Sequence, residues 1–314
     1  MDLAPSQHDH FFRALMERPK AAGALLRERL PPIVAEQLVG DPLLVEGTFV
    51  DKELRSSQSD RLYQVALRGG RSAFIYCLVE HKSAPDPRVA LQLLRYLVRI
   101  WERYDQAIDG TGLLPPILPL VVYHGKPEWS TPALFSSMLA ATDEMRPYLL
   151  DFPFGLLDVG QVEDDKLSNE EELRAGLIVL KYAPRVTEEN VEEVVTWVLT
   201  RLHGVSRELF LLAVRYMLRV YGLTWERFES VSRRVMDERE QWMIGSAARE
   251  LFAQGEATGE AKALVLVLER RFGQLPGDLR RRVDEARAAQ LEAWLERAVD
   301  GATLDEVFGE PSKH

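Results

Sequence analysis

A pair of adjacent glycines, Gly69-Gly70, restricts the fold of this chain more than any other sequence feature. The glycines separate two short runs, residues 61–67 and 73–79, whose length and apolar or aromatic composition are typical of β-strands. Glycine readily adopts the positive φ angles of tight hairpin turns, so a glycine pair between two such runs indicates a reversal of the chain. We therefore predict an antiparallel hairpin built from these two strands.

The remaining elements around the hairpin can be predicted from the spacing of apolar residues. Residues 9–29 have helical spacing, residues 43–50 resemble a strand, and residues 88–106 form an amphipathic helical pattern after Pro87. A buried strand is expected at residues 117–123. The order helix, three strands, helix, strand predicts an α/β core with a mixed sheet and helices packed against it.

The second half of the chain is predicted to be mainly helical. An apolar run at residues 154–159 precedes an acidic loop at residues 163–172, which we interpret as a solvated surface. The polar, glycine-containing stretch 254–259 is the best linker candidate. We predict helices over residues 173–182, 191–203, 208–221, 225–252, 261–272 and 279–298, and three parts: an α/β domain at 1–200, a helical extension and linker at 201–260, and a small helical domain at 261–314.

Composition excludes several classes of protein. The only cysteine is Cys77, so neither an internal disulfide nor a cysteine zinc cluster can form. No apolar run is long enough for a membrane span and no signal peptide is recognised, so we expect a cytoplasmic protein without a membrane partner. The net charge is −10, yet residues 1–130 hold 16 basic and 16 acidic residues, against 23 and 33 in residues 131–314. Charge therefore does not exclude a nucleic-acid partner for the first part.

Two carboxylates and one amine are predicted to meet at the open end of the hairpin. Side chains at i and i+2 of a strand share a face, so Glu80 and Lys82 project together. A turn centred on the glycine pair places Asp60 opposite Val79 or Glu80. Two carboxylates suit Mg²⁺ or Mn²⁺, which can activate water for phosphodiester hydrolysis, and Lys82 can orient that water or stabilise negative charge.

An isolated Glu-x-Lys pair on a strand is usually a surface ion pair, and that interpretation remains open. Two features favour the catalytic one. Glu80 and Lys82 follow the unbroken apolar run at residues 74–79, which indicates the end of an interior strand. Gln92 and Tyr96 on the following helix are four residues apart, so they share a face that can lie over the strand ends.

The arrangement of Asp60, Glu80-x-Lys82 and Gln92-x-x-x-Tyr96 resembles the core of the PD-(D/E)XK nuclease superfamily. The blocks at residues 8–13, 59–65, 79–83, 93–96 and 121–126 resemble, in order, those of the recombination-promoting nuclease (Rpn) family, also labelled YhgA-like transposases. This resemblance implies that Asp60 and Glu80 bind the metal and that Gln92 and Tyr96 line the site. Many members of the family carry Gln where this chain has Lys82.

Asp9 in the first helix has two equally weighted interpretations, a further carboxylate at the site or an N-terminal helix cap. The histidines at positions 8, 10, 81 and 124 lack the spacing of a zinc helix, so structural or substrate-contacting roles are expected for them. The arginines of the last part, Arg271, Arg280, Arg281 and Arg282, belong to a solvated helix face in one interpretation and contact DNA in the other.

The resemblance implies a metal-dependent DNA endonuclease with low sequence specificity, acting in recombination, mobile-element biology or defence. The alternative is a catalytically inactive nucleic-acid-binding or protein-adaptor module on the same fold. Strand joining by a true transposase is not supported, because no element for recognising DNA ends can be located. Since one such core cuts one strand, a homodimer through the helical C-terminal region is expected for double-strand cleavage.

Overall fold

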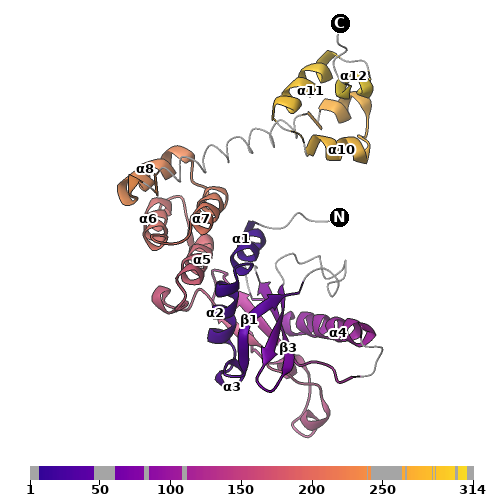
Figure 1. Cartoon of the computed structure of the whole chain (residues 1–314), viewed down its shortest axis with the longest axis vertical. Helices are drawn as coiled ribbons and strands as arrows, with labels where there is room; N and C mark the ends of the chain where they lie inside the picture. Colours follow the sequence, from indigo (N-terminus) through magenta and orange to yellow (C-terminus); the bar gives the residue numbers. More distant parts are fainter. Residues whose placement is uncertain are drawn as a thin grey trace. The chain divides into compact units, whose positions relative to one another are not determined.

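The computed structural model describes residues 7–45, 61–80, 85–107, 112–238, 240–241, 264–265, 267–284, 286, 288–300 and 303–309 of the 314-residue chain (Figure 1). Contacts divide the chain into unit 1, Met1–Asp237, and unit 2, Glu238–His314, and each is described by itself. The predicted domain boundaries after residues 200 and 260 stay predictions. Within the described stretches, no helix has both the length and the apolar character needed to cross a bilayer.

Unit 1 is built on a five-stranded mixed sheet with the strand order β1-β2-β3-β4-β5. β1 to β3 pair antiparallel, whereas β4 pairs parallel with both β3 and β5. The carboxyl ends of β3, β4 and β5 therefore lie side by side, and we call this the carboxyl edge. The bounds are β1 Leu38–Leu44, β2 Arg61–Leu67, β3 Arg71–Glu80, β4 Ile117–Tyr123 and β5 Gly155–Asp158.

The predicted hairpin is confirmed, but its predicted register was wrong. Gly69 and Gly70 have φ angles of 85° and 77°, the left-handed region that glycine tolerates best. The ladder pairs Arg61 with Cys77, whereas the predicted register would pair Arg61 with Leu78 or Val79. The chain reverses around Gly69 alone, with Leu67 opposite Arg71, so each β3 position lies one or two residues earlier than expected.

The predicted strand at residues 43–50 begins earlier than expected and lies at the edge of the sheet. β1 starts at Leu38 and includes Gly40-Asp41-Pro42, which we had expected to precede the strand. Its pairing with β2 shifts register between Val39 and Leu43, and Gly40 within this irregularity has a φ of 71°. A bulge on an edge strand accommodates a proline, because that residue needs no ladder hydrogen bond there.

The sheet lies between α4, Val89–Ala107, and the pair α1, Gln7–Met16, and α2, Pro19–Arg29 (Figure 1). Helix α4 begins two residues after Pro87 and confirms the predicted amphipathic helix. Its apolar side packs on one face of the sheet in a cluster that includes Leu62, Phe74, Val89, Leu93, Tyr96, Ile100, Val121 and Tyr123. On the other face, the Tyr63 hydroxyl donates a hydrogen bond of 3.0 Å to the Met16 carbonyl of α1.

Two helices that follow the sheet, α5 Glu171–Tyr182 and α7 Arg207–Val220, begin at side-chain caps. α5 packs against α1 and α2, and α7 packs against α1 and α5. The side chain of Glu170 accepts from Leu173 N, and that of Ser206 accepts from Leu209 N. The other short elements of unit 1 are α3 Pro32–Ala35, η2 Phe135–Met138, η3 Arg146–Tyr148, η4 Asp164–Lys166, η5 Ala183–Arg185 and α6 Val191–Arg201.

The predicted helix over residues 225–252 was wrong in its length. α8, Trp225–Val235, packs against α6 and ends at Met236, whose backbone is extended with φ −107° and ψ 143°. The helix ends here without a glycine or proline at this point of the sequence. The Met236 side chain is buried, so its tertiary packing coincides with the end of the helix. The predicted linker at 254–259 lies outside the described residues.

Unit 2 is a small helical bundle with its own apolar core. Among its described residues, 267–272 are helical, within the predicted helix 261–272, and the named helices are α10 Gly277–Asp284, α11 Ala288–Asp300 and α12 Leu304–Phe308. The single helix predicted over residues 279–298 is in fact two. Arg271 donates to the Ala298 carbonyl, and Arg282 donates to the Phe308 carbonyl at 3.1 Å. These two arginines join segments of the bundle, a role that neither interpretation of the sequence had included.

Candidate active site at the carboxyl edge

The carboxyl edge brings together the ends of three strands. Glu80, the last residue of β3, pairs with Tyr123 of β4, which pairs with Asp158 of β5. Neighbouring strands lie about 4.8 Å apart, so the backbones of Glu80 and Asp158 are separated by roughly 10 Å. Ligands of open sheets containing parallel strands bind at such carboxyl ends. The prediction that Glu80 ends a central strand is confirmed.

The structure places only part of the predicted metal site. Asp60 and Lys82 lie outside the described residues. For Glu80, only the backbone position in β3 is described. Among the described residues, no group of three His, Cys, Asp or Glu side chains could hold a metal ion. The predicted pair of metal ligands therefore stays a prediction.

Gln92 and Tyr96 lie in the first half of α4, the helix that follows the candidate site. Gln92 is half-buried, and its backbone N–H donates to the Arg88 carbonyl at 3.1 Å. Tyr96 is only 8% exposed and belongs to the same apolar cluster as Tyr123. The helix thus packs on the sheet face to which Tyr123 of the carboxyl edge belongs.

The first turn of α1 is held at the same edge by aromatic contacts. The His8 ring lies 5.2 Å from the ring of the buried His124, the residue after β4, and its Nδ1 lies 2.5 Å from the Tyr216 hydroxyl. Burial raises the pKa of Tyr216, so this hydroxyl stays protonated and can donate to Nδ1. His8 and His124 thus have the structural role that was one of the two predicted.

Asp9, next to His8, is the third residue of α1 and is half-buried. The helix-capping interpretation placed this carboxylate at the N-cap position, which it does not occupy. A carboxylate in the first turn still interacts favourably with the positive end of the helix dipole. Because His8 contacts His124, Asp9 belongs to a turn that is anchored at the carboxyl edge.

Asp158 orders the loops that follow β4 and β5, a role that the predicted apolar run at residues 154–159 did not indicate. Its Oδ2 accepts from the backbone N–H of Trp129 at 2.8 Å, and its Oδ1 accepts from that of Gly160 at 3.0 Å. The Trp129 ring packs edge-on against Tyr123, with ring centroids 5.2 Å apart. Both carboxylate oxygens of Asp158 are thus used for backbone order.

Two glycines in these loops differ in what surrounds them. A Cβ at Gly125 would overlap the hydroxyl and ring of the fully buried Tyr123, whereas a Cβ at Gly160 would meet the guanidinium end of Arg185. We expect Gly125→Ala to lower the free energy of unfolding by about 1–3 kcal/mol, since a buried ring must move. Gly160→Ala is the matched control and should cost less, about 1 kcal/mol, because only the guanidinium end of Arg185 must move and its two hydrogen bonds are exchanged for bonds to water.

Urea denaturation of both variants measures this difference. Equal stability of the two alanine variants would show that the loop after β4 relaxes as easily as the turn after β5.

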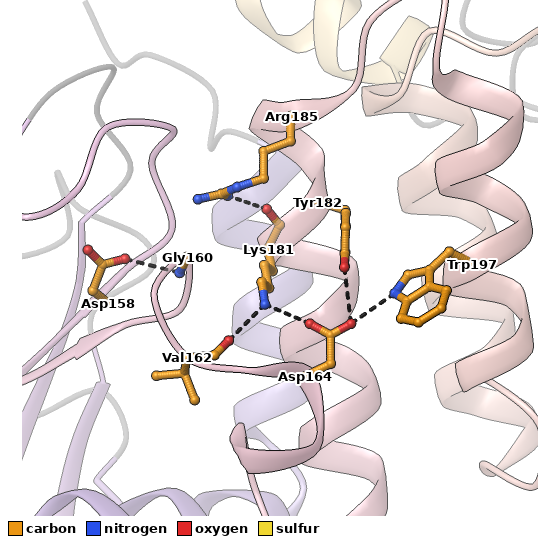
Figure 2. Close-up of polar contacts among 8 residues, drawn as sticks. All are labelled: Asp158, Gly160, Val162, Asp164, Lys181, Tyr182, Arg185 and Trp197. Atoms are coloured by element: carbon orange, nitrogen blue, oxygen red, sulfur yellow. Dashed lines mark hydrogen bonds and ion pairs between the residues drawn. The ribbon is translucent and has the colours of Figure 1, made fainter.

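The predicted acidic loop contains one carboxylate that is not a solvated surface group (Figure 2). Asp164 pairs with Lys181 of α5 at 2.6 Å, and the two side chains are only 11% and 12% exposed. Asp164 Oδ2 also accepts from the Tyr182 hydroxyl at 3.1 Å and from the Trp197 indole at 2.8 Å. The interpretation of the whole loop as solvated was therefore wrong at Asp164, while Glu163 and Asp165 are exposed as predicted.

Burial alone would raise the pKa of Asp164. Hydrogen bonds from Lys181, Trp197 and Tyr182, together with the positive charge of Lys181, outweigh burial and lower it. Lys181 also donates to the Val162 carbonyl at 2.7 Å. The ion pair therefore joins the loop after β5 to α5, and the hydrogen bond from Trp197 joins the same loop to α6.

Comparison with known proteins shows the family of this chain. The family model described as "Putative transposase, YhgA-like" matches residues 6–209. The chain therefore belongs to the YhgA-like transposase family, as its sequence blocks had indicated.

Curated relatives from Escherichia coli include both nucleases and a protein named as inactive. Recombination-promoting nuclease RpnD of strain O157:H7 is 32% identical over 164 residues, covering 51% of this chain and 61% of the relative. Recombination-promoting nuclease RpnA of strain K12 is 31% identical over 161 residues, covering 51% and 54%. Inactive recombination-promoting nuclease-like protein RpnE of strain K12 is 31% identical over 166 residues, covering 52% and 54%.

The chain thus spans a little over half the length of these curated relatives. No solved structure matches it.

Proposed function

We propose that this chain is a metal-dependent nuclease that hydrolyses phosphodiester bonds in DNA, with a core of the PD-(D/E)XK type. The observation that carries the proposal is the position of Glu80, the last residue of a central strand at the carboxyl edge. The names of the relatives RpnD and RpnA support nuclease chemistry. The observed order of helices, three antiparallel strands, helix and parallel strand agrees with such a core.

The proposed metal ligands are Asp60 and Glu80. A residue that extends β2 by one position would share the strand face of Glu80, because Arg61 pairs with Cys77 and side chains alternate along both strands. The observed register therefore still puts position 60 on the same face as Glu80, provided that β2 continues through Asp60. The proposal requires this continuation. A bound Mg²⁺ or Mn²⁺ would activate water and neutralise phosphate charge. Lys82 is proposed to stabilise the negative charge that develops on the phosphate.

Gln92 and Tyr96 are proposed to border the same site from α4. Glu80 is six residues after Phe74, and Phe74 packs in the cluster that contains Tyr96 and Tyr123. Strand alternation therefore predicts that Glu80 shares the face covered by α4. Asp9 is an accessory candidate, since its turn is anchored at the carboxyl edge through His8.

A plasmid nicking assay tests the proposal. We expect conversion of supercoiled DNA to the open-circular form in Mg²⁺ or Mn²⁺, and no conversion when a chelator is present. Many unrelated plasmid sequences should be nicked at similar rates, because the proposed chemistry acts on the sugar-phosphate backbone, which carries no sequence information. Supercoiled plasmid that stays intact across both metals over a wide protein concentration would overturn the proposal.

A second candidate is a catalytically inactive DNA-binding module on the same fold. The similarity to RpnE, whose name marks it as inactive, favours this alternative. The two candidates differ in one outcome, since the inactive module would retard DNA in a gel without cutting it in any metal. A homodimer through the helical C-terminal region also stays a prediction.

A further inference from the structure

We propose that Arg185 forms a phosphate-binding position at the carboxyl edge, which holds a DNA backbone phosphate that flanks the bond to be cut. The inference rests on the proposed nuclease function. Neither the sequence motifs nor the family comparison assigns a role to Arg185.

Figure 2 shows Arg185 and its hydrogen bond to the Lys181 carbonyl, together with Asp158 and Gly160 from the end of β5 and the turn after it. Arg185 Nη2 donates to the carbonyl of Gly125 at 3.3 Å, and Arg185 Nη1 donates to the carbonyl of Lys181 at the end of α5. A Cβ at Gly160 would overlap Nη2, so the absence of a side chain there makes room for the guanidinium. Arg185 thus lies beside the ends of both β4 and β5.

Arg185 forms no ion pair with an acidic residue that the structure describes, although the Asp158 carboxylate lies near its guanidinium. Within the part of the chain that the structure describes, the guanidinium donates to two neutral carbonyl groups. Arg18, Arg61 and Arg227 of the same unit are, in contrast, each paired with a glutamate. Asp158, the acid at this edge, directs its oxygens to the backbone N–H groups of Trp129 and Gly160.

The guanidinium of Arg185 therefore has donors to spare. A guanidinium has five N–H donors, of which the two carbonyl groups use two. The residue is half-buried, so part of it is open to solvent. Exposed Lys126 follows Gly125 in the chain and adds a second positive charge to the same loop. A phosphate oxygen suits these donors because a guanidinium forms charge-assisted, often bidentate hydrogen bonds with it.

The position is also rigid before any ligand binds. Lys181, whose carbonyl holds Arg185, is itself held by its ion pair with Asp164 and its bond to the Val162 carbonyl. A guanidinium fixed in this way loses little conformational freedom on binding, which favours affinity. Since Gly125 is two residues after Tyr123, the partner of Glu80, a DNA strand at Glu80 would pass close to this loop.

A purely structural role competes with this proposal, because a cation near the C-terminal end of α5 also stabilises the helix. The test is therefore DNA binding in Ca²⁺ as a salt titration, with thermal unfolding followed in parallel. We expect Arg185→Gln to weaken DNA binding about tenfold. The slope of log K against the logarithm of the salt concentration should become less steep by about 0.9, the change expected for one lost phosphate contact. The matched control is Arg174→Gln, since Arg174 also donates to a carbonyl, Ser168 O, but lies near the other end of α5.

Gly160→Ala provides a second test that keeps the charge. The added Cβ should displace the guanidinium without backbone strain and weaken DNA binding severalfold while the protein stays folded. Gly160→Ala therefore tests the phosphate position even if the Arg185→Gln variant does not fold. Unchanged affinity and salt slope in Gly160→Ala and in any folded Arg185→Gln would overturn the phosphate position and leave the nuclease proposal standing. A native chain that binds no DNA at all would overturn both.

Discussion

Replacing Asp60 by alanine should abolish metal-dependent nicking of plasmid DNA. Loss of one of two proposed carboxylate ligands removes several kcal/mol of stabilisation of the developing phosphate charge. We expect the single-turnover cleavage rate to fall by about a thousandfold or more. The measurement is a time course of open-circular product in Mg²⁺ and Mn²⁺, with the folded state checked by circular dichroism.

The matched control for this variant is Asp165→Ala. Asp165 is an exposed carboxylate in the acidic loop and contributes no ligand in the proposal. Its removal should leave the cleavage rate within about twofold of the native value. Full activity of a folded Asp60→Ala variant would exclude Asp60 as a metal ligand, and an equal loss in both variants would indicate a general charge effect.

The sequence predicts the central sheet well where local chemistry decides the structure. The Gly69-Gly70 turn, the strand that ends at Glu80 and the strand Ile117–Tyr123 were all expected. The predicted register was wrong because a glycine pair permits more than one turn geometry. The turn that forms is the one that lets the strand side chains pack on both faces of the sheet, and this depends on the whole fold. The start of β1 was predicted too late because proline usually interrupts a strand. An edge strand with a bulge tolerates Pro42, so β1 begins before it.

The helical part shows where tertiary contacts override local patterns. α8 ends at the buried Met236, within a stretch whose composition favours a continuous helix. Arg185 and Asp164 were missed as organising residues for a related reason. Their partners Gly125 and Trp197 lie 60 and 33 residues away in the chain, so no local spacing indicates the contacts.

The Asp164 network has a structural consequence for the candidate site. The ion pair fixes Lys181, and the Lys181 carbonyl fixes Arg185 beside the ends of β4 and β5. The Asp164 ion pair is thus connected to Arg185 through the same residue of α5. Loss of the contact should affect both the stability of unit 1 and the position of the guanidinium.

Asp164→Asn should lower the free energy of unfolding by about 3 kcal/mol at pH 7, because the charge of the largely buried Lys181 loses its counter-charge. Glu163→Gln is the matched control, since Glu163 pairs with Lys166 on the exposed surface and its loss should change stability little. Adding Lys181→Met to Asp164→Leu should recover part of the stability lost in Asp164→Leu alone, because an apolar pair leaves no buried charge.

The same network predicts how stability depends on pH. The folded pKa of Asp164 lies below its unfolded value of about 3.9, so its contribution is fully present above that value and is lost as pH falls through the folded pKa. Urea denaturation at pH 7 and near pH 3 measures both effects. The stability difference between the native chain and Asp164→Asn should shrink at the lower pH, because protonated Asp164 resembles asparagine in charge. A difference that is the same at both pH values would show that the Asp164 carboxylate does not stabilise the fold through its charge.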